Sequence, residues 1–88
     1  MSWGVVAWMV TVKFFAGARE AAGISKVEVE ASSVQAAVDA VVALYGAALA
    51  EMIGISKIWV NGEPAALAAE VFAGDEIAVL PPVSGGFY

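Results

Sequence analysis

Short segments in which apolar and polar residues alternate, with one helical repeat between them, restrict this chain to a small α+β fold. Alternation of this kind is typical of half-buried strands, and it occurs in residues 9–15, 26–30, 55–60 and 76–80. Residues 34–45 instead place apolar side chains at the spacing of an amphipathic helix. Asn61-Gly62 favours a two-residue hairpin turn, which predicts one more short strand. We therefore expect a mixed sheet of four to five strands with one main helix packed on one face.

The predicted helix has recognisable signals at both ends. Ser32-Ser33-Val34-Gln35 matches a capping box, in which a serine oxygen accepts a backbone N–H and the glutamine reaches back to the serine. Gly46 is expected to end the helix in the left-handed conformation. We predict a short connector with at most one helical turn at residues 17–23, and one further short helical turn at residues 47–52. Ala73-Gly74-Asp75 is expected to form the turn before the last strand, with Asp75 as a turn residue.

The chain has 88 residues, which is enough for one domain with a modest core. We assign residues 9–82 to this domain. Residues 1–8 are interpreted as an N-terminal extension of unknown role, and residues 83–88 as a flexible C-terminal tail.

Missing residue types exclude several kinds of site. The chain contains no Cys and no His, which removes disulfides, thiolate nucleophiles and the usual zinc ligands. We therefore expect no metal site, no bound cofactor and no independent catalysis. No stretch reaches the ~18 apolar residues that a membrane span needs, so no membrane contact is expected and the cytoplasm is the expected location.

The charged residues argue against nucleic acid as a partner. The formal net charge is −5, and Lys13, Arg19, Lys26 and Lys57 are scattered singly along the sequence. Nucleic-acid binding depends on clustered cations that displace counterions from phosphates. An acidic chain is better suited to docking on basic protein surfaces.

The segment Pro81-Pro82-Val83-Ser84-Gly85-Gly86 is the strongest candidate for a functional site. Two prolines end the last strand and keep the backbone extended beyond it. Gly85 and Gly86 have no side chain, so a carboxylate placed on Gly86 is open to attack and fits a narrow channel. A polar terminus without a role is the alternative interpretation.

Two longer stretches give this tail a context. VKFFAGARE at residues 12–20 and GDEIAVLPPVSGG at residues 74–86 resemble the small subunit of molybdopterin synthase, a sulfur carrier of the ThiS/MoaD ubiquitin-like family. The resemblance covers about residues 9–86 in length and element order, and the PPVSGG ending is its most specific part. It implies a β-grasp, ubiquitin-like fold.

The resemblance also implies a function. In that family a ubiquitin-activating-type enzyme uses ATP to adenylate the C-terminal glycine, which then takes sulfur from a donor protein and becomes a thiocarboxylate. The tail enters the large subunit of a heterotetramer and donates sulfur to a cyclic pyranopterin, which forms the molybdopterin dithiolene of the molybdenum cofactor. By this resemblance Gly86 carries the sulfur, Gly85 provides clearance and residues 81–84 pass through the channel.

A partner surface is predicted on the outer face of the sheet. Phe15, Trp59 and Leu80 alternate with core residues on three strands that the fold would place side by side, and Ala78 lies between them. An exposed apolar patch of this kind usually marks an interface. Arg19 is either part of that interface or a support for its own loop. If Arg19 formed an exposed ion pair with a carboxylate of the loop, the pair would contribute only ~0–1 kcal/mol to folding stability.

Phe87 and Tyr88 follow the diglycine and depart from the family pattern. We expect them to be removed before Gly86 can react. A cloning remnant and a diverged chain that no longer carries sulfur are the alternatives. Three other functions stay open: a sulfur carrier for thiamine or cysteine synthesis, a ubiquitin-like protein modifier attached through Gly86, and an interaction module that does not use its C-terminus.

Overall fold

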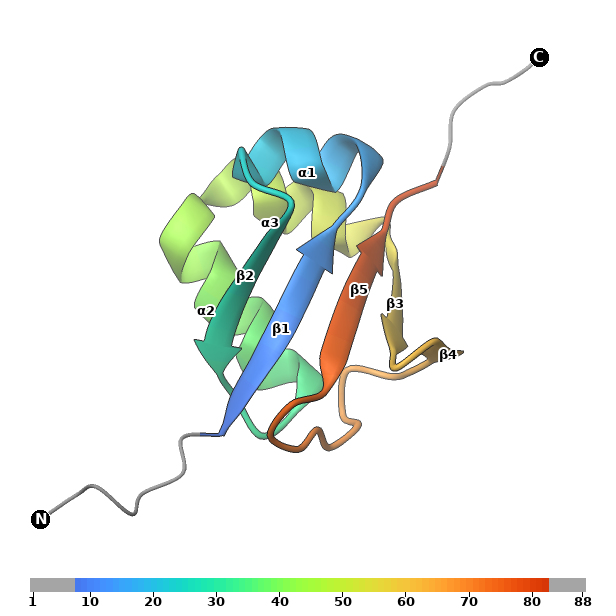
Figure 1. The fold of residues 1–88 in the computed structure, drawn as a ribbon. Coiled ribbons are helices and arrows are strands. Elements are labelled where there is room, and N and C mark those ends of the chain that lie inside the picture. Colours follow the sequence, from blue (N-terminus) through green and yellow to red (C-terminus); the bar gives the residue numbers. More distant parts are fainter. Residues whose placement is uncertain (1–7, 83–88) are drawn as a thin grey trace, which may run out of the picture.

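The computed structural model describes residues 8–82 and confirms an α+β fold (Figure 1). The strands are β1 (Met9–Phe14), β2 (Lys26–Glu30), β3 (Lys57–Val60), β4 (Glu63–Pro64) and β5 (Glu76–Leu80). The helices are α1 (Ala16–Ala22), α2 (Val34–Tyr45) and α3 (Ala47–Gly54).

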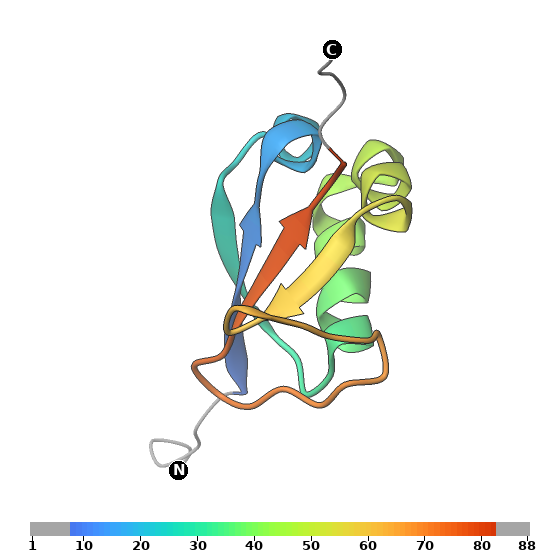
Figure 2. The same ribbon diagram turned by 90° about the vertical axis from the view of Figure 1, so that its right-hand side faces the viewer.

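The five strands form one mixed sheet in the order β2-β1-β5-β3-β4. β1 and β5 are parallel neighbours at its centre, and the other pairs are antiparallel. Helices α2 and α3 lie on one face of the sheet, while α1 lies near the end at which β1 and β5 finish (Figures 1 and 2). The opposite face has no helix over it in these views.

The core lies between the sheet and the helices. Ile77 and Val79 of β5 are fully buried, as the alternation predicts. Phe14 is also buried, and its ring meets the Tyr45 ring edge-on with a centroid separation of 6.1 Å. Buried residues from α2 and α3, including Val41 and Leu49, fill the space beneath the strands.

Helix α2 begins as predicted, but only half of the capping box forms. The Ser33 hydroxyl oxygen accepts the backbone N–H of Ala36 at 3.0 Å. The Gln35 side chain does not reach back to the serine and instead donates to Asp39 at 2.9 Å. Gln35 is the second helical residue rather than the third, so it is one position too early for the reciprocal bond. Gly46 ends the helix with φ 96° and ψ −169°, which is a positive φ but not the left-handed conformation that we predicted.

Two segments are more helical than the sequence indicated. The connector after β1 is the seven-residue helix α1, and the single turn predicted after Gly46 is the eight-residue helix α3. Both are rich in alanine, which has the highest helix propensity, and each buries residues against the core. The longer α3 also shortens the predicted third strand, because residues 55 and 56 close the helix and β3 starts at Lys57.

The N-terminal end of the described chain is packed against the domain. Trp8 lies in the segment that we interpreted as an extension, yet its indole N–H donates to the Val71 carbonyl at 2.7 Å. Its ring also lies 6.0 Å from the ring of Phe72. The Trp8 carbonyl oxygen accepts the N–H of Ala31 at 2.8 Å, so the backbone continues toward β1 in contact with the following loop.

Candidate functional site

The candidate site is centred on the end of β5, where the chain leaves the sheet (Figure 1). Leu80 is the last strand residue, Pro81 is buried against the domain and Pro82 is exposed. Proline lacks an N–H and cannot donate to a neighbouring strand, which explains why the ladder stops there. The predicted tail residues 83–86, including Gly85 and Gly86, lie outside the described residues.

Strand register places three of the predicted interface residues on the outer face near this exit. Ala78 is the register partner of Trp59, and Leu80 follows it two positions later on the same face. All three side chains are half-buried. Phe15 directly follows the register pair Phe14–Val79, and its side chain is 44% exposed. We call Phe15, Trp59, Ala78 and Leu80 the apolar patch.

Arg19 lies on helix α1 and not in a loop. It is exposed, and it lines a depression of about 340 Å³ beside β1 and β2. The other residues lining this depression are Lys13, Phe14, Phe15, Ser25 and Lys26. The structure therefore brings Arg19 next to Phe15 and next to two lysines. We did not anticipate this grouping, because the three cations are separated by six and seven positions in the sequence.

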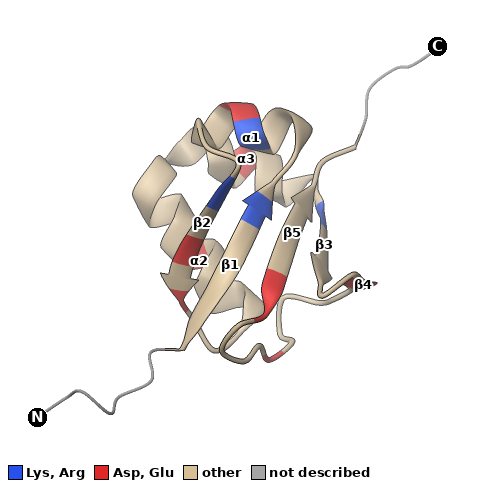
Figure 3. Ribbon diagram, viewed as in Figure 1, with Lys and Arg blue, Asp and Glu red and all other residues tan. Residues whose placement is uncertain are grey.

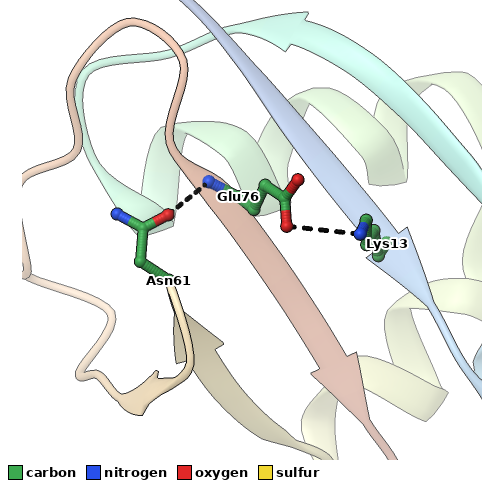
Figure 4. Close-up of polar contacts among 3 residues, drawn as sticks. All are labelled: Lys13, Asn61 and Glu76. Atoms are coloured by element: carbon green, nitrogen blue, oxygen red, sulfur yellow. Dashed lines mark hydrogen bonds and ion pairs between the residues drawn. The ribbon is translucent and has the colours of Figure 1, made fainter.

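A polar cluster fixes the opposite end of β5. The Asp75 carboxylate accepts the backbone N–H of Phe72 at 2.8 Å and the side-chain amide of Asn61 at 3.0 Å. Asn61 in turn accepts the N–H of Glu76 at 2.9 Å, while Glu76 forms an ion pair with Lys13 at 3.2 Å (Figure 4). The bonds from Phe72 and Asn61 lower the pKa of Asp75 below its ordinary value. These contacts confirm Asp75 as a turn residue.

An apolar groove borders the other side of β3 and was missed at the sequence level. It has a volume of about 720 Å³ and is lined by residues of α2, α3, β3 and the chain after β4. Its apolar lining includes Val38, Ile53, Ile58, Trp59 and Leu67. We did not predict this groove, because α3 forms one of its walls and we expected only a single helical turn there. Trp59 thus borders both the groove and the apolar patch.

The described residues do not form the kind of site that would hold a metal ion. Within residues 8–82, no three Asp, Glu, His or Cys side chains gather as ligands. No helix in this part of the chain is long and apolar enough to cross a membrane. The features that remain are the exit of β5 and the outer surface around it.

Comparisons with known proteins match this description. The ThiS family profile matches residues 12–86. Small archaeal modifier protein 1 of Haloferax volcanii is 39% identical over 84 aligned residues, which cover 84% of this chain and 97% of that protein. Its crystal structure superposes with a TM-score of 0.81 at 36% identity, covering 89% of this chain and 99% of the other. The sequence match and the superposition therefore agree over nearly the whole of that protein.

Two solved complexes also contain a similar chain. One is the complex of subunits 1 and 2 of the molybdopterin-converting factor from Helicobacter pylori, with a TM-score of 0.66, 28% identity and coverage of 89% of this chain and 99% of that one. The other is the BexX/CysO complex from Amycolatopsis orientalis, with a TM-score of 0.73, 28% identity and coverage of 88% and 99%. In both cases the similar chain was solved in a complex with a protein partner.

Proposed function

This chain belongs to the ThiS family of small ubiquitin-like proteins, and on that basis we propose that it carries sulfur on the main-chain carboxylate of Gly86. The observation that carries this proposal is the extent of the family match, which runs to residue 86, the second glycine of the pair. The buried Pro81 and exposed Pro82 direct the chain out of the sheet four residues before that point. A carrier of this kind needs its reactive group at the end of an extended exit.

The proposed chemistry proceeds in two steps on partner enzymes. A carboxylate oxygen of Gly86 attacks the α-phosphate of ATP, which forms an acyl-adenylate and releases pyrophosphate. A hydrosulfide ion supplied by a donor protein then attacks the acyl carbon, the C–O bond to AMP breaks, and loss of the sulfur-bound proton leaves a thiocarboxylate on Gly86. Glycine suits both steps because no Cβ obstructs the carbonyl carbon. ATP is bound by the activating enzyme, and the carrier itself needs no cofactor.

We further propose that the sulfur is delivered to a cyclic pyranopterin, with this chain as the small subunit of molybdopterin synthase. The similarity to a chain in the molybdopterin-converting factor complex of Helicobacter pylori supports this assignment. The sequence of residues 12–20 and the PPVSGG ending support it independently. In this role the apolar patch contacts the large subunit, and the tail extends from it into the partner's active site.

A second candidate function is covalent modification of other proteins through Gly86. It is favoured by the 39% identity to small archaeal modifier protein 1, a higher identity than that of the chain in either complex. Cysteine synthesis stays open because of the similarity to a chain of the BexX/CysO complex, and thiamine synthesis stays open as well. All these functions begin with the same activation of Gly86 and differ in the acceptor.

Isolation of the protein from its own cells tests both the proposed sulfur carriage on Gly86 and the proposed delivery of that sulfur to a pyranopterin. An intact mass that shows a chain ending at Gly86, heavier than the plain carboxylate by the difference between sulfur and oxygen, supports sulfur carriage. Co-purification with a pterin-synthase large subunit supports the molybdopterin assignment, whereas a ladder of larger covalent adducts supports the modifier. A chain whose Gly86 carries neither sulfur nor an adduct during active growth would refute the proposal.

A further inference from the structure

The cations of this chain gather at one end of the outer sheet face. Lys13 and Lys26 are register partners on β1 and β2, and Lys13 also stands opposite Ala78 of β5. Lys57 is the register partner of Leu80, the last residue of β5. Figure 3 shows the Lys and Arg positions toward the end of the molecule at which β5 finishes.

Arg19 completes this group from helix α1, where it lines the depression that Lys13 and Lys26 also line. We call Lys13, Arg19, Lys26 and Lys57 the basic end; these are all the Lys and Arg residues of the chain. Within the described residues the only ion pair is that of Lys13 with Glu76. The other three cations, Arg19, Lys26 and Lys57, are exposed to solvent.

Acidic residues occupy other parts of the surface. On β2 and β5 the exposed Glu28, Glu30 and Glu76 lie farther from the end of β5 than the lysines of the same sheet. Glu20 of α1 and Glu51 of α3 line a separate depression between these two helices. A chain with a net charge of −5 therefore has one basic region, and that region surrounds the exit of the tail.

The basic end includes a pair of like charges on neighbouring strands, which lowers the stability of the fold. Lys13 and Lys26 are directly opposite each other on adjacent antiparallel strands. Like charges in this position are destabilising. Glu76 partly compensates Lys13, whereas Lys26 forms no ion pair among the described residues. The position of Lys26 is explained if it faces a carboxylate of another molecule.

We propose that the basic end docks on an acidic surface of the enzyme that activates Gly86, beside the site that receives the tail. This inference rests on the proposed function, since it concerns the partner that adenylates Gly86. Sulfur carriage and protein modification both require that partner, so the inference does not depend on the final acceptor. Ala78 and Leu80 of the apolar patch lie on β5 between Lys13 of β1 and Lys57 of β3, which gives an interface with an apolar centre and a charged rim.

Charges at the rim of an interface mainly accelerate encounter and exclude wrong partners. The tail can enter the activating enzyme only when the region around Pro82 faces that enzyme. Attraction between the basic end and an acidic surface of the enzyme therefore orients the carrier for reaction. The expected signature is a value of kcat/KM that falls as salt is added, because exposed charges are screened over ~10 Å at 0.1 M salt.

A charge swap within β2 tests the inference. The double variant Lys26→Glu/Glu30→Lys keeps the net charge at −5 but moves a cation away from the end of β5. The single variant Glu30→Lys is the matched control, since it alters the far end only. The assay measures acyl-adenylate formation with ATP and the activating enzyme of the same organism, from low to high salt. It uses whichever form of the chain reacts, the 88-residue form or the form ending at Gly86.

We expect the swap to lower kcat/KM about tenfold at low salt through KM, which is at the lower limit of known steering effects, and to weaken its salt dependence. The control should keep the parent's kcat/KM. Thermal unfolding should show that the swapped chain is at least as stable as the parent, because the Lys13–Lys26 repulsion is removed. A loss of activity without a loss of stability separates docking from folding.

Two outcomes overturn the inference in distinguishable ways. If the parent is adenylated and the swap leaves kcat/KM and its salt dependence unchanged, the basic end has no role in docking and the proposed function stands. If no form of the parent chain is adenylated, the proposed function fails and the inference fails with it.

Discussion

Truncation of Phe15 is the most direct test of the apolar patch. Phe15 is 44% exposed and comes immediately before α1, where its side chain makes no capping hydrogen bond. Phe15→Ala therefore removes exposed apolar surface without removing a hydrogen bond from the fold. The large subunit of molybdopterin synthase is the partner that we propose for this patch.

The exposed area sets the size of the effect. A phenylalanine side chain offers about 200 Å² of surface, so a 44% exposed ring can bury about 90 Å² against a partner. At about 25 cal/mol per Å² this gives about 2 kcal/mol of binding free energy, or a Kd about thirtyfold weaker in the variant. Isothermal titration of the large subunit from the same organism measures this change.

Phe72→Ala is the matched control for this titration. Phe72 is also an exposed phenylalanine, at 55%, but it lies in the loop before β5, at the opposite end of that strand from the exit. We expect Phe72→Ala to bind like the parent. Thermal unfolding of both variants checks that each remains folded at the titration temperature. Equal affinity of Phe15→Ala and Phe72→Ala would show that the apolar patch is not the docking surface.

Three further predictions concern the tail and the turn before β5. In a chain ending at residue 86, Gly86→Ala should fold normally but lose most thiocarboxylate formation, because the new methyl group obstructs the reacting carbonyl; unchanged formation, measured by intact mass, would remove Gly86 from the mechanism. With ATP and the activating enzyme, a chain ending at Gly86 should form acyl-adenylate while the 88-residue chain should not, and equal reactivity would refute the need for processing. The lowered pKa of Asp75 means that its ionised form contributes stability above the ordinary pKa of 3.8, and that this contribution is lost as pH falls through the lower folded value. Asp75→Asn should therefore be less stable than the parent at pH 7, and urea unfolding should show the difference narrowing below about pH 4; a difference independent of pH would contradict this assignment.

The alternating pattern of β1, β2, β3 and β5 could be predicted because each of these strands has the core on one side only. A period of two places Ile77 and Val79 against the helices, and the structure shows both fully buried. The Asn61-Gly62 turn was equally predictable, because both residues adopt the positive φ that a tight hairpin turn requires. These features depend on neighbours in the sequence, so the sequence alone specifies them.

The two shorter helices could not be predicted in the same way. Each is under nine residues, which is too short for a clear helical period, and each is stabilised mainly by packing. Ala18 and Leu49 are fully buried, and α1 packs against α3 and β5, which come much later in the chain. The groove beside β3 was missed for this reason, since α3 forms one of its walls.

The gathering of the cations near the candidate site could not be predicted, because net charge contains no positions. The register of β1, β2, β5 and β3 places Lys13, Lys26 and Lys57 toward the end at which β5 finishes, although the chain as a whole has a net charge of −5. The glutamates of the same sheet lie toward the other end. An acidic partner surface would therefore attract one end of this chain and repel the remainder, which turns the tail toward the partner before contact.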